Sequence, residues 1–408
     1  MKGVVFSLTL ALGIGSASAQ FFVVDGMKYT ILDETKNTCA ISGFSTSVMT
    51  PDVEIPEFVT YKDIEYAVTE IGYNAFCNTP VESVKIPSSI ISIGINSFNG
   101  TRLKTVTIPK TVLNIGSNSF GNCPHLEYIR VEEDNINYSS VDGVLYNKTK
   151  DIIVQYPGAR KEVVVPDDVY LIYDGAFDGC SSIASIELPE SITEIGREAF
   201  SGCSSLILIN IPAGVKEIGM HTFKGCVSLE SVNLPSEIEV IDRYAFLNCS
   251  SLASIKLPEN LKYIGESAFN SCSSLTSVVF PENLRYIEKF AFYRCGSLNT
   301  VTCLSDKFIG IEEGAFSDID KDAKLYVVPN LIEEYKNSDW GNYFAEILPL
   351  EPSTGVEEIK IDNLMPFDVY NLSGALVKKN ASKENLTELT PDIYIIRQGN
   401  ASQKIRVR

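Results

Sequence analysis

Seven cysteines that recur at one repeat position are the residues of this chain whose type and spacing could most directly do chemistry. They are Cys123, Cys180, Cys203, Cys226, Cys249, Cys272 and Cys295, and the last six follow one another every 23 residues. A cysteine thiolate can act as a nucleophile, form a disulfide or ligate zinc. Which of these chemistries is open to them depends on the elements that hold the side chains.

The spacing of the cysteines favours a structural role. No pair has the C-x-x-C spacing, and thiolates stacked in file do not form a tetrahedron around zinc. Even cysteine counts in exported proteins often mean disulfides, and stacked repeats would bring neighbouring Cα atoms within bridging distance. Side chains that point in parallel into a core nevertheless approach one another poorly, and cysteine is a good small buried residue. We therefore expect a ladder of buried free thiols and no metal site.

The other residues that serve catalysis are few or scattered. The two histidines are His125 and His221, and His221 occupies a repeat position that holds Glu, Tyr, Ser or Phe elsewhere, which suggests an outer surface. Carboxylates are plentiful but spread along the repeats, and no G-x-S-x-G, H-E-x-x-H or phosphate-binding loop occurs. We expect no catalytic residue, no enzyme and no cofactor.

A regular spacing of phenylalanines predicts the secondary-structure elements that hold all these residues. The repeated phenylalanines are Phe76, Phe98 and Phe120 at a spacing of 22, then Phe177, Phe200, Phe223, Phe246, Phe269 and Phe292 at a spacing of 23, and Phe316 after 24. A fixed period of about 20–29 residues with Leu or Ile at set positions is typical of leucine-rich repeats. One coil cannot bury its own apolar side, so neighbouring coils stack around a continuous core. The predicted fold is a repeat solenoid with a small C-terminal β module.

Each repeat divides into three parts. Ile255 and Leu257 alternate with polar residues, which predicts a short half-buried strand that ends at Pro258. A second short extended piece follows and closes at a glycine. Ala268 and Phe269 then precede Cys272 at the spacing of a single helical turn that packs inward. The solenoid is therefore expected to combine short parallel strands with single helical turns.

The chain divides into four predicted segments. Residues 1–19 read as a secretory signal, with Lys2, an apolar stretch and a small-x-small cleavage site before Gln20. Residues 20–70 are expected to form an N-terminal β cap, and residues 71–350 the solenoid. The solenoid contains an elongated repeat at 132–168, where a hairpin is expected, and a C-terminal cap at 317–350. Residues 351–408 are expected to form a linker and a β tail.

Several sequence motifs resemble a known family. The unit "IGESAFNSCSSLTSVVFPENL" from Ile264 to Leu284, the stretch "SSVDGVLYN" and the pieces "LYVVP" and "YKNSDW" are similar to BspA-like leucine-rich-repeat proteins. The resemblance covers Phe21 to Leu350. It implies a secreted or surface protein of a host-associated bacterium that binds host matrix proteins or other cells and is not an enzyme.

The tail has a resemblance of its own. "VYNLSGALV", "DIYIIR" and the basic ending from Lys404 to Arg408 resemble the C-terminal sorting modules of the type IX secretion route. The tail departs from that pattern by being short and by carrying "TPDIY". Export by that route and a plain β tail both stay open.

Charge and hydropathy limit the partners and the location. The net charge is −18, so the chain repels nucleic-acid phosphates and anionic membrane surfaces. No stretch after the signal reaches the ~18 consecutive apolar residues of a membrane span, so we expect no transmembrane segment in the mature chain. The signal predicts export to the extracellular space or the outer surface of a bacterium, and the periplasm is an alternative.

One surface patch departs from the background of small polar residues. Lys262 and Tyr263 occupy the same positions in one repeat as Arg285 and Tyr286 in the next. Aromatic side chains beside cations are typical of binding hot spots, although such rings can also simply pack along the solenoid and bury one another. The candidate ligand-binding residues are Tyr244, Lys262, Tyr263, Arg285, Tyr286, Phe290 and Tyr293.

Three functions are compatible with these features. The first is adhesion to a protein or glycan on a host or neighbouring cell surface, without catalysis. The second is a structural role as a spacer in the cell envelope. The third is a glycan-binding or glycan-acting protein, and an enzyme of that kind needs a cleft with two convergent carboxylates.

Overall fold

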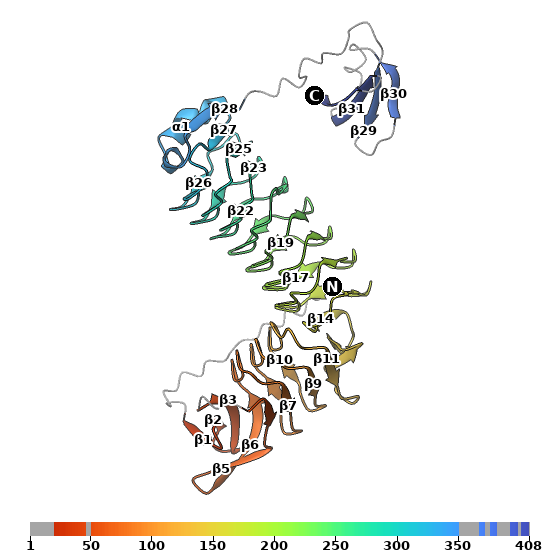
Figure 1. Ribbon diagram of the computed structural model, residues 1–408, viewed down its shortest axis with the longest axis vertical. Helices are drawn as coiled ribbons and strands as arrows, with labels where there is room; N and C mark the ends of the chain where they lie inside the picture. The colour runs from red at the N-terminus through yellow and green to blue at the C-terminus, as the bar shows by residue number, and fades with distance from the viewer. Residues whose placement is uncertain are drawn as a thin grey trace.

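The computed structural model describes residues 20–45, 50–350, 367–371, 376–381, 392–398 and 401–407. The predicted signal segment lies outside these residues. Figure 1 shows the coils of residues 50–350 stacked one above another along the long axis. The predicted solenoid of leucine-rich repeats of about 23 residues is confirmed by this architecture.

The first side of the solenoid is a ladder of short parallel strands, most of which end at or near a proline. Its strands are β4 (Asp52–Glu54), β7 (Ser83–Lys85), β9 (Thr105–Ile108), β11 (Tyr128–Val131), β16 (Ser185–Ile186), β18 (Leu208–Asn210), β20 (Ser231–Asn233), β23 (Ser277–Phe280), β25 (Thr300–Cys303), β27 (Lys324–Val327) and β28 (Glu346–Pro349). Apolar side chains alternate inward along these strands, as at Val278 and Phe280 of β23. The period-two pattern of the sequence therefore places one face in the core.

The second side is another parallel ladder, built from two residues per repeat, which are followed by glycine in several of the coils. Its strands are β8 (Ser92–Ile93), β10 (Asn114–Ile115), β15 (Leu171–Ile172), β17 (Glu194–Ile195), β19 (Glu217–Ile218), β21 (Val240–Ile241), β22 (Tyr263–Ile264), β24 (Tyr286–Ile287) and β26 (Gly310–Ile311). The Ile of each pair faces the core, and the residue before it faces outward. This outward column carries much of the candidate site.

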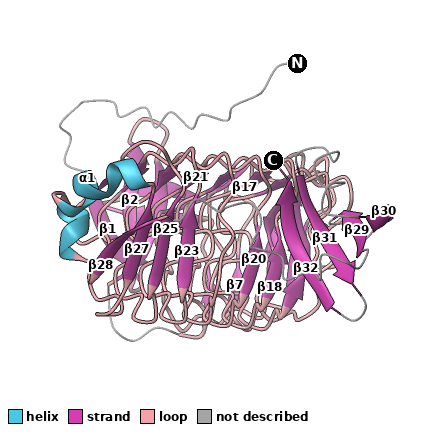
Figure 2. Cartoon of the chain, turned by 90° about the horizontal axis from the view of Figure 1, so that it is seen from above, coloured by secondary structure: helices cyan, strands magenta, loops and turns pink. Residues whose placement is uncertain are grey.

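The third side is a stack of turns rather than the single helical turns that the spacing predicts. The N–H groups of Glu198 and Phe200 donate to carbonyls of the next coil, and only alternate N–H groups, such as that of Ala199, bond within the turn. Two residues per turn have a left-handed backbone, as at Tyr244 (φ 59°) and Asn248 (φ 62°). These conformations interrupt the regular φ/ψ that an α-helix needs. Figure 2 shows that helix is confined to the region of α1.

A stack of phenylalanine rings fills the core on the turn side. The rings from Phe177 to Phe316 lie in parallel layers, with centroids of neighbouring rings 5.0 to 5.5 Å apart. Phe76, Phe98 and Phe120 form a shorter stack in the first coils. These rings are fully buried and account for the strict repetition of Phe in the sequence.

The elongated repeat forms the hairpin strands β12 (Tyr138–Val141) and β13 (Val144–Asn147), followed by β14 (Ile152–Gln155). β14 pairs in parallel with β15, so it takes the place of a second-side strand. Tyr156 then takes the place of a ladder phenylalanine, with its ring 4.8 Å from that of Phe177. Leu145 and Val154 belong to the core of the first coils, whereas Val144, Tyr146 and Ile153 belong to the core of the later coils.

Different elements lie at the two ends of the coil stack. At the N-terminal end, β1 (Phe21–Val24), β2 (Met27–Asp33), β3 (Thr38–Phe44), β5 (Phe58–Tyr61) and β6 (Ile64–Ile71) form a sheet that continues into β8. At the other end, η1 (Pro329–Leu331), α1 (Ile332–Lys336) and η2 (Asp339–Asn342) cover the last coil. Trp340 is fully buried there, and its Nε1 donates to the carbonyl of Ile309 at 2.9 Å.

The tail forms a small antiparallel sheet of its own. Its strands are β29 (Phe367–Asn371), β30 (Leu376–Ala381), β31 (Asp392–Gln398) and β32 (Ala401–Val407), in the order β30-β29-β31-β32. Within the described part of the chain, no helix has the length and apolar character needed to cross a membrane.

Candidate functional site

The structure brings the predicted surface residues together on adjacent coils. Tyr263 and Tyr286 lie opposite each other in the register of β22 and β24, and the backbone N–H of Arg285 donates to the carbonyl of Lys262. Tyr244, Phe290 and Tyr293 lie on the turns that follow the second-side strands. We call the seven predicted residues, Tyr244, Lys262, Tyr263, Arg285, Tyr286, Phe290 and Tyr293, the aromatic patch.

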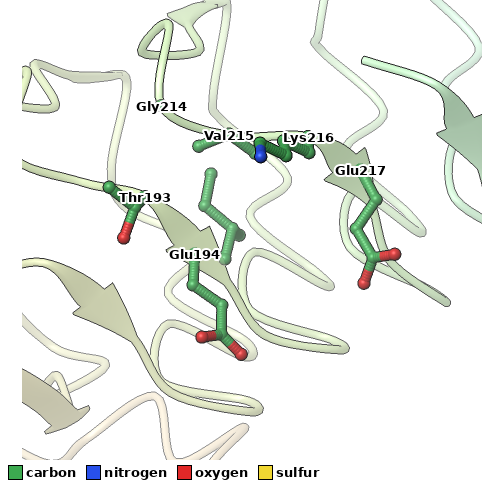
Figure 3. Close-up of a pocket in the computed structure, with 7 residues that line it drawn as sticks. Thr193, Glu194, Gly214, Val215, Lys216 and Glu217 are labelled. Atoms are coloured by element: carbon green, nitrogen blue, oxygen red, sulfur yellow. The ribbon is translucent and has the colours of Figure 1, made fainter. Parts of the chain in front are cut away.

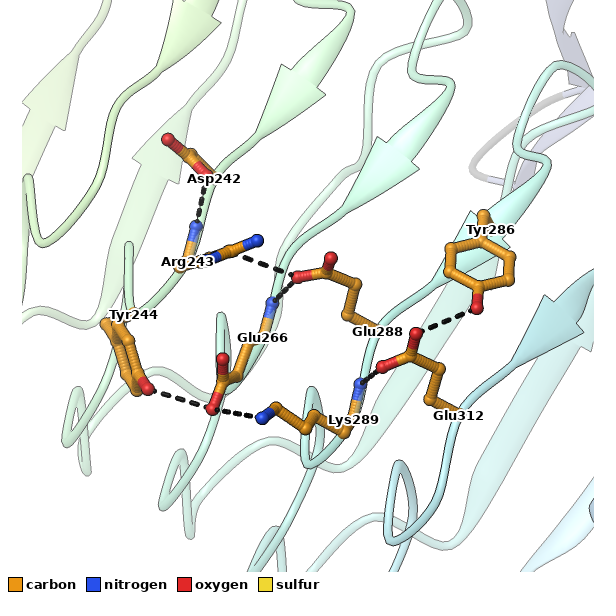
Figure 4. Close-up of polar contacts among 8 residues, drawn as sticks. All are labelled: Asp242, Arg243, Tyr244, Glu266, Tyr286, Glu288, Lys289 and Glu312. Atoms are coloured by element: carbon orange, nitrogen blue, oxygen red, sulfur yellow. Dashed lines mark hydrogen bonds and ion pairs between the residues drawn. The ribbon is translucent and has the colours of Figure 1, made fainter.

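Glutamates that sequence reasoning missed hold the tyrosines of the patch in place. The hydroxyl of Tyr244 donates to Oε1 of Glu266 at 2.9 Å, and the hydroxyl of Tyr286 donates to Oε1 of Glu312 at 2.9 Å. Lys289 Nζ lies 3.3 Å from the same Oε1 of Glu266. Figure 4 shows these contacts crossing from coil to coil over one continuous surface.

Two of the missed glutamates also bind the backbone. Glu288 Oε2 accepts the N–H of Glu266 at 2.8 Å, and Glu312 Oε2 accepts the N–H of Lys289 at 3.1 Å. Arg243 Nε lies 3.4 Å from Glu288 Oε2. Glu288 and Glu312 stand at the repeat position that is glycine in several other coils. That substitution is the sequence signal that could have found them.

The surroundings of the tyrosines favour the protonated hydroxyl. The hydrogen bonds to Glu266 and Glu312 raise the pKa values of Tyr244 and Tyr286. For Tyr263, burial raises the pKa first, and a hydrogen bond to Glu288 raises it further. These hydroxyls therefore act as hydrogen-bond donors and not as bases or nucleophiles.

Most cations over the patch are paired. Lys262 Nζ lies 2.7 Å from Glu239 Oε2, and Arg294 Nε lies 3.9 Å from Asp318 Oδ2. Arg285 differs, because its Nη1 donates to the backbone carbonyls of Glu282 and Leu284. Tyr286 and Phe290 each keep 38 % of their surface exposed. The patch thus presents aromatic faces and paired charges to the solvent.

The cysteine ladder lies inside the core as buried free thiols. Cys226 Sγ donates to the carbonyl of Phe200 in the preceding coil at 3.1 Å, and Cys295 Sγ makes the same bond to Phe269. Burial raises the pKa of both thiols to about 12. The thiolate that nucleophilic or metal chemistry requires is therefore disfavoured at these positions.

The first coils show what the cysteine position requires. Thr79 and Thr101 occupy it there, and each threonine hydroxyl donates to the carbonyl of the phenylalanine three residues earlier in its own coil. Thr101 Oγ1 also contacts Cys123 Sγ at 3.2 Å. The position therefore takes a small side chain with an O–H or S–H donor.

A shallow pocket between two second-side strands offers a second candidate site. It is lined by Thr193, Glu194 and Ile195 on one coil and by residues 214–217 on the next. Figure 3 shows Glu194 and Glu217 extending side by side from their strands, without converging on a common point. Two carboxylates flanking one scissile bond are what glycoside hydrolysis needs, and this pair does not supply that arrangement. Among the described residues, no three His, Cys, Asp or Glu side chains lie close enough together to hold a metal ion.

His221 lies at the edge of the turn side. Its Nδ1 is 3.4 Å from Glu198 Oε1, and its ring stacks on that of Tyr244 with centroids 4.9 Å apart. The side chain keeps 21 % of its surface exposed. His221 therefore continues the row of contacts that passes through the aromatic patch.

Comparisons with known proteins agree with this architecture. The model of the family described as "BspA type Leucine rich repeat region (6 copies)" matches residues 63–153, 156–250 and 239–338, about two thirds of the chain. No curated protein matches.

Several solved structures are similar. The pneumococcal vaccine antigen PcpA is 19 % identical over 81 % of this chain and 98 % of its own, with a TM-score of 0.52, which shows a shared fold. A leucine-rich repeat protein from Bacteroides ovatus is 26 % identical over 80 % of this chain and 99 % of its own, with a TM-score of 0.45. A leucine rich cell surface protein from Faecalibacterium prausnitzii is 25 % identical over 64 % of this chain and 94 % of its own, with a TM-score of 0.41.

Proposed function

The chain belongs to the BspA type leucine-rich repeat family, and on that premise we propose that it is an exported surface protein that binds other proteins without catalysing a reaction. Its role is adhesion to a host or neighbouring cell. The aromatic patch is the surface that makes the contact.

One observation supports the patch above the rest of the surface. Tyr286 and Phe290 keep exposed ring surface, Tyr263 lies opposite Tyr286 on the neighbouring coil, and Glu312 of the next coil accepts a hydrogen bond from the Tyr286 hydroxyl. Tyr and Arg dominate binding hot spots because they bury a large, rigid area at a low cost in conformational entropy. A ring that is already held in place loses less entropy when a ligand covers it.

The proposal of export and of surface attachment rests on the sequences at the two ends of the chain. Residues 1–19 act as the secretory signal, and the tail acts as a type IX-like sorting module. The tail motifs and the antiparallel sheet of β29 to β32 support the second part of this proposal. The mature chain then resides outside the cell or on its outer surface.

The direct test measures retention of ligands by the purified mature chain. Matrix proteins, mucin and whole cells are passed over the immobilised chain at physiological salt. Selective retention of at least one protein surface is expected, and failure to retain any of them contradicts adhesion. Crosslinking in intact cells separates the rival spacer role, because a spacer yields only self-contacts and envelope proteins.

A further inference from the structure

One position in each turn of the solenoid has a left-handed backbone two residues before the ladder phenylalanine. We call it the corner position. Along the chain it is occupied by Asn74, Asn96, Asn118, Gly175, Glu198, His221, Tyr244, Ser267, Phe290 and Gly314, with φ between 53° and 71°. Asparagine or glycine occupies this position in the first four coils and glycine in the last, and the larger side chains fall between them.

The residue types at the corner position differ in the free energy that the left-handed backbone conformation costs them. Glycine has no Cβ to clash, and asparagine tolerates the left-handed region, so the first coils adopt it easily. A bulky residue such as Tyr244 or Phe290 is an outlier there, and such outliers gather at functional sites. At the second left-handed position of the turn, asparagine and glycine occur up to Asn248, and Ser271, Arg294 and Asp318 follow, so Arg294 is the one bulky residue there among the described coils.

The strained side chains form a continuous edge along the solenoid. Glu198 contacts His221, His221 stacks on Tyr244, and Tyr244 donates to Glu266. Farther along, the Phe290 ring meets that of Tyr293, and the Arg294 guanidinium lies 4.9 Å from the centroid of the Tyr293 ring.

The charges of this edge are largely balanced within it. Glu266 faces Lys289, and Arg294 faces Asp318. Within a chain of net charge −18, such an edge offers no strong attraction to a polyanion or a polycation. Recognition therefore has to come from the ring faces and from the flat guanidinium.

We propose that the corner residues Glu198, His221, Tyr244 and Phe290, together with Arg294, are ligand contacts kept at the expense of backbone strain. The ligand is a protein that lays aromatic or apolar side chains along this edge. The inference rests on the proposed function and extends the binding surface beyond the aromatic patch to Glu198, His221 and Arg294.

The test replaces strained residues by the residue that relaxed coils carry. The variants are Tyr244→Asn, Phe290→Asn, their double variant and His221→Asn in the full chain, and Ser267→Asn is the matched control at the same position without a ring. A phage-displayed random peptide library is enriched on the unaltered chain, and the binding of the enriched peptides to each variant is then measured. Thermal unfolding followed by circular dichroism reports on the fold.

We expect enriched peptides that contain aromatic residues and bind the double variant at least about tenfold more weakly. His221→Asn should weaken binding as well, while Ser267→Asn should not, and all four variants and the control should keep the cooperative unfolding of the parent. The affinity should change less than about twofold when the salt concentration rises, because few free charges are involved.

Three outcomes overturn the inference in different ways. Peptides that bind the variants and the parent equally well refute the role of the corner residues and leave the proposed function standing. A library that yields no enriched peptide refutes protein binding, and with it both proposals. A large loss of thermal stability with unchanged binding shows that the rings are kept for packing alone.

Discussion

At the scale of single residues, the cysteines show how repetition decides between chemistries. The sequence predicted buried thiols because seven cysteines share one position of a stacked repeat. It did not predict the bond from each ladder thiol to a carbonyl of the preceding coil, as from Cys226 to Phe200. The sequence did contain a signal for this bond, because Thr79 and Thr101 occupy the same repeat position in the first coils. Threonine and cysteine are both small and both carry a hydrogen-bond donor.

Thiol labelling tests the state of the ladder. At pH 8 a thiol reagent should react with Cys77, the half-buried cysteine, and leave the ladder untouched, because the ladder thiols are buried and protonated. All ten cysteines should react after unfolding in guanidinium. The number of modified residues is read by mass spectrometry. Rapid labelling of Cys226 or Cys249 in the folded chain contradicts the assigned packing.

The same thiols predict a loss of stability at high pH. Burial raises the pKa of the Cys226 thiol from the ordinary 9.0 to about 12, so above pH 9 the unfolded chain has lost a proton that the folded chain retains. The free energy of unfolding should therefore fall as the pH rises from 9 towards 12, by up to about 1.4 kcal/mol per thiol per pH unit. Denaturant titrations at several pH values measure the slope. A variant with Cys226→Thr and Cys295→Thr should show a smaller slope, and an equal slope contradicts the explanation.

The candidate site could be predicted only in part at this scale. Tyr263 and Tyr286 stood out because each follows a cation, Lys262 or Arg285, at matching positions of two successive repeats. Glu288 and Glu312 did not stand out, because carboxylates are abundant in the chain and their partners are backbone N–H groups one coil away. Pairing between coils depends on register and turn geometry, which the period alone does not fix.

At the scale of elements, the repeat pattern predicted the two ladders of strands correctly. Its prediction of helical turns on the third side was wrong. The alternation of apolar and polar residues and the proline that follows are local signals, so they predict the strands reliably. The spacing of Ala268, Phe269 and Cys272 suits a helical turn, but left-handed residues on both sides of the phenylalanine prevent one. Left-handed backbone at Tyr244 or Phe290 is not expected from those residue types, which is why the sequence did not reveal it.

The hairpin region supplies the first ring of the later phenylalanine stack through Tyr156. The sequence shows a gap of 57 residues between Phe120 and Phe177, and Tyr156 fills the missing ring position because it stacks on Phe177. Its hydroxyl donates to the carbonyl of Glu162. The periodicity of phenylalanine did not indicate this ring, because the residue is a tyrosine and follows an irregular insertion.

Substitution at Tyr156 tests that role. Tyr156→Ala should lower the free energy of unfolding by about 3–5 kcal/mol, because it removes a fully buried ring from the stack. Tyr156→Phe should cost only about 1 kcal/mol, because it removes one hydrogen bond and keeps the ring. Guanidinium unfolding measures both values. A small effect of Tyr156→Ala would show that the ring does not act as a member of the buried stack.

At the scale of the whole molecule, we propose that the repeats and the tail are separate folding units with separate roles. The solenoid has its own covered ends and its own core, whereas β29 to β32 form a sheet with no strand pairing to the coils. The stacking of coils of about 23 residues was predictable because each repeat contacts only its neighbours. The ligand was not predictable, because surface columns vary freely without loss of the fold.

Deletion of the tail tests this division of roles. A chain truncated before Val356 should keep the thermal midpoint of the solenoid, since the last coil is covered by α1 and Trp340. The truncated chain should also stay inside the cell envelope while the full chain reaches the outer surface or the medium. Cell fractionation and immunoblotting measure the distribution. Equal export of both chains contradicts a sorting role for the tail.

The central claim is that the solenoid binds a protein surface through its aromatic patch, and one comparison of variants tests it most directly. The double variant Tyr263→Ala and Tyr286→Ala is compared with Glu194→Ala and Glu217→Ala, which alter the same repeat position outside the patch. Retention of the matrix protein or mucin that the parent chain captures is measured at equal loading. The patch variant should lose at least about tenfold in affinity while the control retains it. Equal retention by the two variants, with both folded, would contradict the account.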